Sequence, residues 1–228
     1  MSRSLPSLIR DLRLRRGRER RGLALAEGIR LVEEAMAAQV AIRGAAIAPG
    51  LEATERGRAL KAALAERGVA IESVTDRELA QLADTEHPQG VVAVIEPPRW
   101  TLADMAPSQG HPVLVLDAVQ DPGNVGAMVR TALALGAAGV VALKGTAELT
   151  SPKVLRGSMG ALFRLPVVNA DAAALNAWLT EQRVALWVAA MDGDPISQVA
   201  REKHGAIALV VGNEGAGVGD DVARMAQR

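Results

Sequence analysis

The chain has 228 residues and a formal net charge of zero; 49% of its residues are hydrophobic and only 2% are aromatic. It contains no cysteine, which excludes disulfides, thiol nucleophiles and cysteine-ligated metals, and its three histidines lack metal-ligand spacing, so we expect no metal. Because no apolar run is long enough to span a membrane and no signal-peptide pattern occurs, we expect a cytosolic protein of two domains with no membrane contact.

The start of the chain is rich in arginine. Residues 3–21 contain eight arginines against two acidic residues, which gives this segment a net charge of +6 and leaves −6 for the rest. Planar guanidinium groups bind pairs of phosphate oxygens, and a cluster of them attracts a nucleic-acid backbone. A solvated helix face explains the same charges equally well. The candidate phosphate contacts of this segment are Arg15, Arg16, Arg20 and Arg21.

The first part of the chain, residues 1–97, has the pattern of a small α/β domain. Short apolar runs predict strands, and apolar residues at helical spacing predict helices between them. The predicted strands are 40–49, 69–74 and 90–98, and the predicted helices are 29–39 and 51–68. Prolines, a glycine and polar residues mark 98–110 as a linker.

The second part, residues 111–228, alternates apolar strands with helical stretches. Nearly continuous apolar runs such as "PVLVLDAV" are typical of strands that are buried on both faces of a parallel sheet. The predicted strands are 112–119, 138–145, 165–170, 183–190 and 205–213. This order predicts a doubly wound α/β fold, in which ligands bind at the carboxyl ends of the strands.

The stretch "DPGNVGAMVRTALALG", residues 121–136, joins a turn to an apolar helix. We predict that the helix begins near Asn124, which would be its N-cap, and that an apolar stripe faces the sheet. At about 100° per residue, Arg130 points away from that stripe, toward a cleft or solvent. A plain cap and a plain surface charge are the alternative interpretations of these two residues.

Two further stretches contain candidate binding residues. "ALVVGNEGAGVG", residues 208–219, has four glycines that leave the backbone accessible to a flat ligand, although it fits neither the dinucleotide fingerprint nor a phosphate loop. A tight turn with Asn213 in the left-handed conformation is the alternative. "SPKVLRGSMGALFRLPV", residues 151–167, is either a phosphate-contacting helix start or a plain connector.

Together these three stretches, in this order, resemble the motifs of the SpoU (TrmH-like) branch of the SPOUT superfamily of RNA ribose 2′-O-methyltransferases. "RRGLALAEGIRLVEEA" and "EHPQGVVAVI" are similar to the amino-terminal substrate-binding domain of that family. The resemblance implies a SPOUT-type α/β fold: a parallel sheet with a carboxy-terminal trefoil knot at 111–228, after a small RNA-binding domain at 1–97. It also implies transfer of a methyl group from S-adenosylmethionine to a ribose 2′-hydroxyl of ribosomal or transfer RNA by a homodimer.

The resemblance also implies roles for individual residues. Arg130, Asn124 and Glu214 become the catalytic residues. Because a guanidinium with a free pKa above about 12 stays charged, we expect Arg130 to act as an electrostatic clamp rather than as a base. The implied cofactor-binding residues are Val211, Gly212, Asn213, Gly215, Gly217 and Ala190. The implied RNA-binding residues are Arg156 and Ser158 together with the four arginines named above.

The sequence departs from the family pattern at its end. A third motif, with serine and asparagine, is absent, because the sequence stops in the helix after the second motif. We expect that the chain is truncated; if the third motif is instead lost, cofactor affinity, knot and dimer are in doubt, and the last strand leaves an open sheet edge. The alternatives are an RNA-binding protein of the same fold that has lost the cofactor, and an RNA base methyltransferase from a sister SPOUT branch.

Overall fold

The chain folds into two compact units, each with its own sheet. The computed structural model describes residues 4–191, 193–195, 198 and 204–228. Unit 1 consists of Met1–Pro98 and Leu149–Phe163, and unit 2 consists of Arg99–Glu148 and Arg164–Arg228. Leu149–Phe163 lies between two strands of unit 2 in the sequence but packs with unit 1, which the sequence did not indicate.

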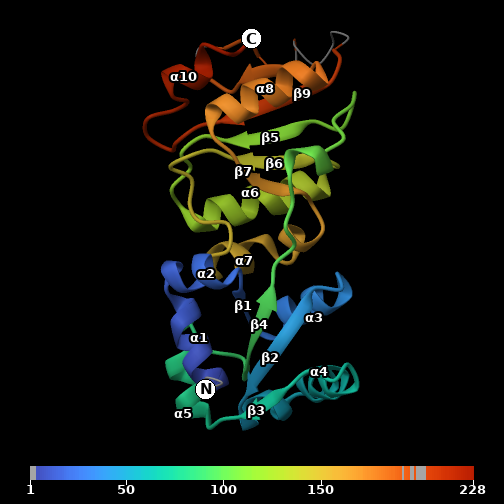
Figure 1. Ribbon diagram of the computed structural model, residues 1–228, viewed down its shortest axis with the longest axis vertical. Coiled ribbons are helices and arrows are strands. Elements are labelled where there is room, and N and C mark those ends of the chain that lie inside the picture. Colours follow the sequence, from blue (N-terminus) through green and yellow to red (C-terminus); the bar gives the residue numbers. More distant parts are fainter. Residues whose placement is uncertain (1–3, 192, 196–197, 199–203) are drawn as a thin grey trace. The chain divides into compact units, whose positions relative to one another are not determined.

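Unit 1 contains a four-stranded mixed sheet with the strand order β1-β4-β2-β3 (Figure 1). Strand β4 is antiparallel to both β1 and β2, whereas β2 and β3 are parallel. The strands are β1 (Ala24–Glu27), β2 (Ala41–Ile47), β3 (Ile71–Ser73) and β4 (Val91–Glu96). The helices are α1 (Leu5–Arg13), α2 (Arg15–Arg21), α3 (Ile29–Ala37), α4 (Glu55–Glu66), α5 (Asp76–Leu82) and α7 (Pro152–Ser158), with short 3-10 turns η1 (Pro49–Ala53) and η3 (Ala161–Phe163).

Local capping explains where two of these helices begin. Thr54 accepts a hydrogen bond from the backbone of Gly57, so the predicted helix 51–68 is divided into η1 and α4. Thr75 and Glu78 form a reciprocal capping box at the start of α5. The predicted strands and helices of this part are confirmed, whereas β1 and α5 were not predicted.

One arginine of the basic segment has a structural role. Arg18 is only 5% exposed, and its guanidinium donates to the carbonyl oxygens of Leu12 and Arg13, where α1 ends. These carbonyls have no partner within the helix, so the buried cation satisfies them. Gly22, with φ of 64°, then ends α2 in the left-handed conformation that glycine adopts without strain.

Unit 2 contains a five-stranded sheet with the order β7-β6-β5-β9-β8, and every neighbouring pair is parallel. The prediction of a parallel α/β sheet is therefore confirmed. The open edge that the alternative of a lost third motif placed at the last strand does not occur there, because β9 lies between β5 and β8 and pairs with both. The strands are β5 (Val113–Leu116), β6 (Gly139–Ala142), β7 (Val167–Asn169), β8 (Ala185–Val188) and β9 (Ile207–Val211).

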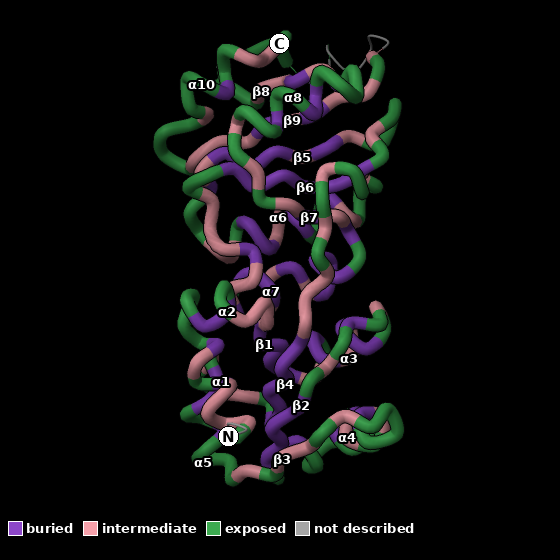
Figure 2. Tube along the Cα trace, viewed as in Figure 1, coloured by how far each residue is buried: buried purple, intermediate pink, exposed green. Residues whose placement is uncertain are grey.

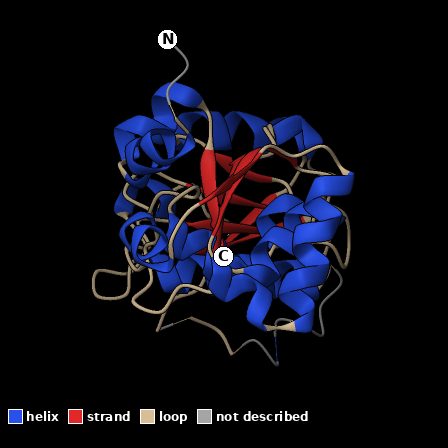
Figure 3. Ribbon diagram, turned by 90° about the horizontal axis from the view of Figure 1, so that it is seen from below, coloured by secondary structure: helices blue, strands red, loops and turns tan. Residues whose placement is uncertain are grey.

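Helices lie beside the strands of the chain (Figure 3). Unit 2 has helices of its own. They are α6 (Pro122–Ala134), α8 (Ala172–Gln182), α10 (Asp220–Ala223) and the 3-10 turn η2 (Leu102–Asp104). Val113 and Val115 of β5 pack with Leu175 and Leu179 of α8 in one buried cluster, so α8 covers that face of the sheet. Strands β5 and β6 are accordingly among the buried parts of unit 2 (Figure 2). Within the described residues, no helix is long and apolar enough to cross a bilayer.

Candidate functional site at the carboxyl ends of β5 and β9

Two loops meet where the adjacent parallel strands β5 and β9 end. The loop after β9 contains a tight turn in which Asn213 and Gly217 exchange backbone hydrogen bonds of 2.9 and 3.0 Å. The side chain of Asn213 accepts from the backbone of Gly215 and Ala216, at 2.9 Å each. Gly217, with φ of 73°, adopts the left-handed conformation, so the alternative that placed Asn213 there is wrong.

The loop after β5 is bonded to this turn on one side. The side-chain amide of Asn213 donates to the carbonyl oxygen of Ala118 at 2.9 Å, and the backbone of Gly219 donates to Asp117 Oδ2 at 2.7 Å. Asp117 is buried, and Ala118 has φ of 55°, which is rare outside glycine. These two residues were missed by the sequence analysis, and no sequence signal distinguished them from strand residues.

Glu214 joins the two loops on the other side. Its carboxylate accepts from Asn124 Nδ2 at 2.9 Å and from the backbone of Gln120 and Asp121 at 3.3 and 3.4 Å. The side-chain hydrogen bond from Asn124, followed by backbone hydrogen bonds, holds the pKa of Glu214 below its usual value. The structure therefore brings the predicted residues Asn124 and Glu214 together, with the carboxylate in its charged form.

The start of α6 differs from the prediction. Asp121, not Asn124, is the N-cap, and its side chain accepts from the backbone of Asn124 at 2.9 Å. The helix begins at Pro122, because proline suits the first helical position, where no amide hydrogen is needed. The Asn124 side chain is consequently available for Glu214.

Arg130 lies on the same helix as Asn124 but faces elsewhere. Val125 and Val129 are fully buried, as the predicted stripe requires, and Arg130 is exposed. Arg130 follows Asn124 by six residues, which corresponds to about 9 Å along the axis and about 120° around it. Within one chain, Arg130 and the Asn124–Glu214 pair thus occupy different faces of α6.

The backbone of the glycine-rich loop is open where a ligand would lie. A Cβ at Gly212 would be 2.2 Å from the carbonyl carbon of Gly217, so this close approach requires glycine. A Cβ at Gly217 would meet no atom within 4 Å, and one at Gly215 only Asn213 Oδ1 at 3.7 Å. Val211, the last residue of β9, leads into this loop.

Ala190 lies at the same edge of the sheet. It follows β8, and the preceding residue, Ala189, donates its amide hydrogen to Val210 of β9 at 3.0 Å. Ala190 itself is exposed. The predicted cofactor-binding residues therefore come from the carboxyl ends of two neighbouring strands, β8 and β9.

The predicted RNA-binding residues of α7 are less accessible than expected. Ser158 is fully buried, and its hydroxyl donates to the carbonyl oxygen of Leu155 at 2.8 Å, so its position contradicts a contact with RNA. Arg156 is half-buried and donates to Glu27 at 3.3 Å and to Asp84 at 2.6 Å. Both acceptors belong to unit 1.

Three of the four predicted arginines of α2 have ion-pair partners. Arg20 and Arg21 both donate to Asp11, at 2.8 and 2.6 Å. Arg15 donates to Glu19 at 2.7 Å. Arg16 is exposed and has no ion-pair partner among the residues that the structure describes.

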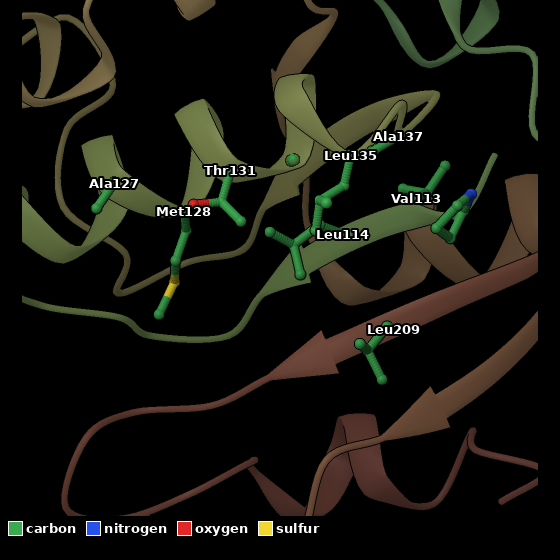
Figure 4. Close-up of a pocket in the computed structure, with 10 residues that line it drawn as sticks. Val113, Leu114, Ala127, Met128, Thr131, Leu135, Ala137 and Leu209 are labelled. Atoms are coloured by element: carbon green, nitrogen blue, oxygen red, sulfur yellow. The ribbon is translucent and has the colours of Figure 1, made fainter. Parts of the chain in front are cut away.

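An apolar groove of about 350 Å³ lies beside α6 in unit 2 (Figure 4). Met128 and Leu135 border it from the helix, Leu114 borders it from β5, and Leu209 borders it from β9. Leu135 is 76% exposed. This face of the sheet is less completely covered than the face under α8.

A parallel sheet with two polar loops bonded to each other at its carboxyl edge places unit 2 in the class of α/β folds whose ligands bind at that edge. The profile of the SpoU rRNA Methylase family matches residues 111–228, and that of the MRM3-like substrate binding domain matches residues 8–93. The chain belongs to the SpoU rRNA methylase family.

Relatives and solved structures agree with this assignment. The chain is 36% identical over 154 residues to the 23S rRNA (guanosine(2553)-2′-O)-methyltransferase RlmP of Bacillus subtilis, which covers 67% of this chain and 59% of the relative. It is 32% identical to the human mitochondrial rRNA methyltransferase 3 over 73% of this chain and 40% of that relative. The chain thus spans about half the length of these relatives. An AdoMet-bound rRNA methyltransferase from Sinorhizobium meliloti matches 99% of this chain and 85% of its own, with 28% identity and a TM-score of 0.82.

Proposed function

We propose that the protein transfers a methyl group from S-adenosylmethionine to a ribose 2′-hydroxyl, with ribosomal RNA as the substrate. The observation that carries the proposal is the hydrogen bond between Asn124 and Glu214, which joins the two motif loops at the carboxyl edge of a parallel sheet. The names of the Bacillus relative and of the AdoMet-bound structure support the reaction and the cofactor.

The residues at this edge suit the cofactor. The glycine backbone at 215 and 217 presents a surface without side chains against which a flat adenine can lie, and Val211, Gly212, Asn213 and Ala190 complete the proposed binding residues. When bound, the cofactor supplies an already activated methyl group. The protein then has to align the ribose and to assist loss of the hydroxyl proton.

In our proposal, Glu214 and Arg130 contribute to the alignment of the ribose and to the loss of the proton in different ways. Glu214, which is ionised because its pKa is lowered, holds Asn124 and the start of α6 in a fixed orientation. Arg130 is the electrostatic clamp that stabilises the developing alkoxide or binds a neighbouring phosphate, because its guanidinium offers two donors in a plane.

A homodimer is part of the proposal. Arg130 faces about 120° away from Asn124 around α6, so a second subunit is the simplest way to bring an arginine to the glycine-rich loop. The apolar groove beside α6 supports this association, because an exposed apolar surface of this kind favours a protein contact. A trefoil knot stays a prediction of the family resemblance.

The proposal is tested with the full chain, S-adenosylmethionine and ribosomal RNA. Digestion of the product to nucleosides should give 2′-O-methylribose. Arg130→Lys should lower kcat by about 100-fold, because the lysine ammonium lacks the two coplanar donors of the guanidinium. Arg183→Lys, at an exposed arginine of the same unit, is the control and should keep the activity. Methylation on a base would favour the sister SPOUT branch.

Calorimetry with S-adenosylhomocysteine separates the enzyme from a non-enzymatic RNA-binding protein. We expect binding by the wild type and by Arg130→Lys, since the proposed cofactor residues lie at the end of β9, in the loop after it and just after β8, and not on α6. Absence of binding by the wild type, together with retained RNA binding, would contradict the enzymatic function.

A further inference from the structure

Unit 1 contains a cavity lined by residues of the stretch 151–167 and of the two stretches that resemble the substrate-binding domain. It has a volume of about 190 Å³ and lies among the turn from β1 to α3, the loop from α5 to β4, and α7. Its lining includes Gly28, Arg30, Leu31, Gln89, Arg156 and Met159. All of these residues belong to unit 1, which contains the matched substrate-binding domain.

The acidic group of the cavity is already neutralised. Glu27 is 6% exposed, and its carboxylate accepts from the backbone of Asp84 at 2.7 Å, from the backbone and hydroxyl of Thr85, and from Arg156. Arg156 donates in addition to Asp84. Arg156 is therefore shared by the carboxylates of Glu27 and Asp84.

Arg30 is the positively charged residue of the cavity that is accessible to a ligand, because Arg156 already binds Glu27 and Asp84. It is exposed, it lines the cavity, and within residues 4–191, 193–195, 198 and 204–228 it has no ion-pair partner. Gln89 Oε1 accepts from the backbone of Ile29 at 3.0 Å, which leaves the side-chain NH₂ group of Gln89 as a second donor. A ligand in this cavity thus meets the donor groups of Arg30 and Gln89, so it must present acceptors.

The walls and the backbone favour a flat ligand. Leu31 is buried, and Met159 offers a thioether that makes favourable contacts with aromatic rings. Met159 has φ of 49°, and strained conformations of this kind persist at functional sites. Gly28 has φ of 92°, and a Cβ there would lie 3.0 Å from Gln89 Oε1, so a side chain would displace the donor group.

We propose that this cavity binds an unpaired base of the RNA substrate by its acceptor edge. Arg30 and Gln89 donate to the base, and Leu31 and Met159 contact its face. Guanine matches best, because its O6 and N7 accept two hydrogen bonds from one guanidinium, and proteins read unpaired RNA bases in this way. This inference rests on the proposed function, since it names the recognition element of the same RNA substrate.

The test is fluorescence anisotropy with the full chain and short single-stranded RNAs. The probes are oligouridine, and oligouridine with one central guanosine or one central 7-deazaguanosine, which lacks the N7 acceptor. We expect the wild type to bind the guanosine probe at least about fivefold more tightly than oligouridine, and Arg30→Gln to lose this preference. Arg77→Gln, at an exposed arginine on α5 with no ion pair in the described chain, removes the same charge and should keep the preference.

Three outcomes decide the proposal. Loss of the guanosine preference in Arg30→Gln alone, with a weaker preference for the 7-deaza probe, supports it. Equal binding of all probes by the wild type overturns it. Equal losses on all probes in Arg30→Gln and Arg77→Gln overturn it as well, because Arg30 would then be a general phosphate contact.

Calorimetry with S-adenosylhomocysteine keeps this inference separate from the proposed function. The proposed cofactor residues lie in unit 2 and Arg30 lies in unit 1, so Arg30→Gln should bind S-adenosylhomocysteine as the wild type does. If the base preference is absent while cofactor binding and methylation persist, only the cavity assignment fails.

Discussion

Glu214 accepts hydrogen bonds from two backbone groups of the loop before α6 and from the Asn124 side chain in its first turn, and an ionised carboxylate accepts them more strongly than a protonated one. Its lowered pKa follows first from the Asn124 side chain and then from backbone amides. A group whose pKa is lowered in the folded state stabilises that state above the pKa of the unfolded chain. This stabilisation is lost as the pH falls through the lowered pKa.

Glu214→Gln should therefore reduce stability near neutral pH, because the charge is lost and the NH₂ group replaces one acceptor oxygen, so it opposes either the Gln120 amide or the donors of Asp121 and Asn124. The difference in unfolding free energy from the wild type should be largest at about pH 7 and should shrink as the pH falls toward about pH 3. Urea unfolding across this range measures it. Glu181→Gln, at an exposed glutamate of α8, is the control. A difference that does not change with pH would contradict an ionised role of Glu214.

At the scale of single residues, the sequence identified side chains of the types that the chemistry requires. It did not identify the hydrogen bonds between them. Asn124, Glu214 and Arg130 were found through the motifs, and the structure joins the first two. The N-cap was misplaced by three residues because Asp121 and Asn124 are both good caps, and only the backbone path decides between them. The burial of Ser158 could not be read from its neighbours, because it depends on how α7 packs in unit 1.

Helix α7 illustrates what is decided at the scale of elements. It follows β6 in the sequence, yet Arg156 binds Glu27 at the end of β1 and Asp84 after α5. A second close fit supports this placement, because a Cβ at Gly160 would lie 2.6 Å from the Cβ of Glu34 in α3. The segment therefore completes unit 1, and Arg156 is the polar contact that fixes it there.

Arg156→Gln should lower the free energy of unfolding of unit 1 by about 2 kcal/mol, the usual contribution of a partly buried hydrogen bond to a charged group. Hydrogen exchange should show faster exchange in Pro152–Ser158 and around Asp84, and little change in the strands of unit 2. Arg77→Gln serves as the control, because that arginine is exposed on α5. Unchanged exchange in α7 would show that Arg156 does not hold this segment.

Eight of the nine strands in the described part of the chain were predictable, because each is a short apolar run between turn signals. Strand β1, "ALAE", was missed because its small residues do not stand out from the helices on either side. Strand order was not predictable, because the placement of β9 between β5 and β8 depends on pairing between residues that are distant in the sequence.

For the whole molecule, the net charge of zero conceals an uneven distribution. The segment 3–21 carries a net charge of +6, but some of its arginines already bind groups of the same chain. Arg18 is buried at the end of α1, and Arg20 and Arg21 both pair with Asp11. The low aromatic content of 2% leaves little scope for stacking of bases on rings. Phosphate contacts should therefore supply most of the affinity for RNA, which makes that affinity sensitive to salt.

Charge reversal at Arg15, Arg16, Arg20 and Arg21 together should weaken RNA binding and flatten its dependence on salt. Among single changes, Arg16→Gln should reduce the slope of log affinity against log salt by about 0.7 to 0.9, the value for one phosphate contact. Arg20→Gln should reduce it less, because Arg20 must first leave Asp11 to reach a phosphate. Anisotropy titrations at several salt concentrations measure both slopes. A wild-type affinity that does not change with salt would show that the basic segment does not contribute to RNA binding. Equal slopes for the two variants would show that the Asp11 ion pair does not restrain Arg20.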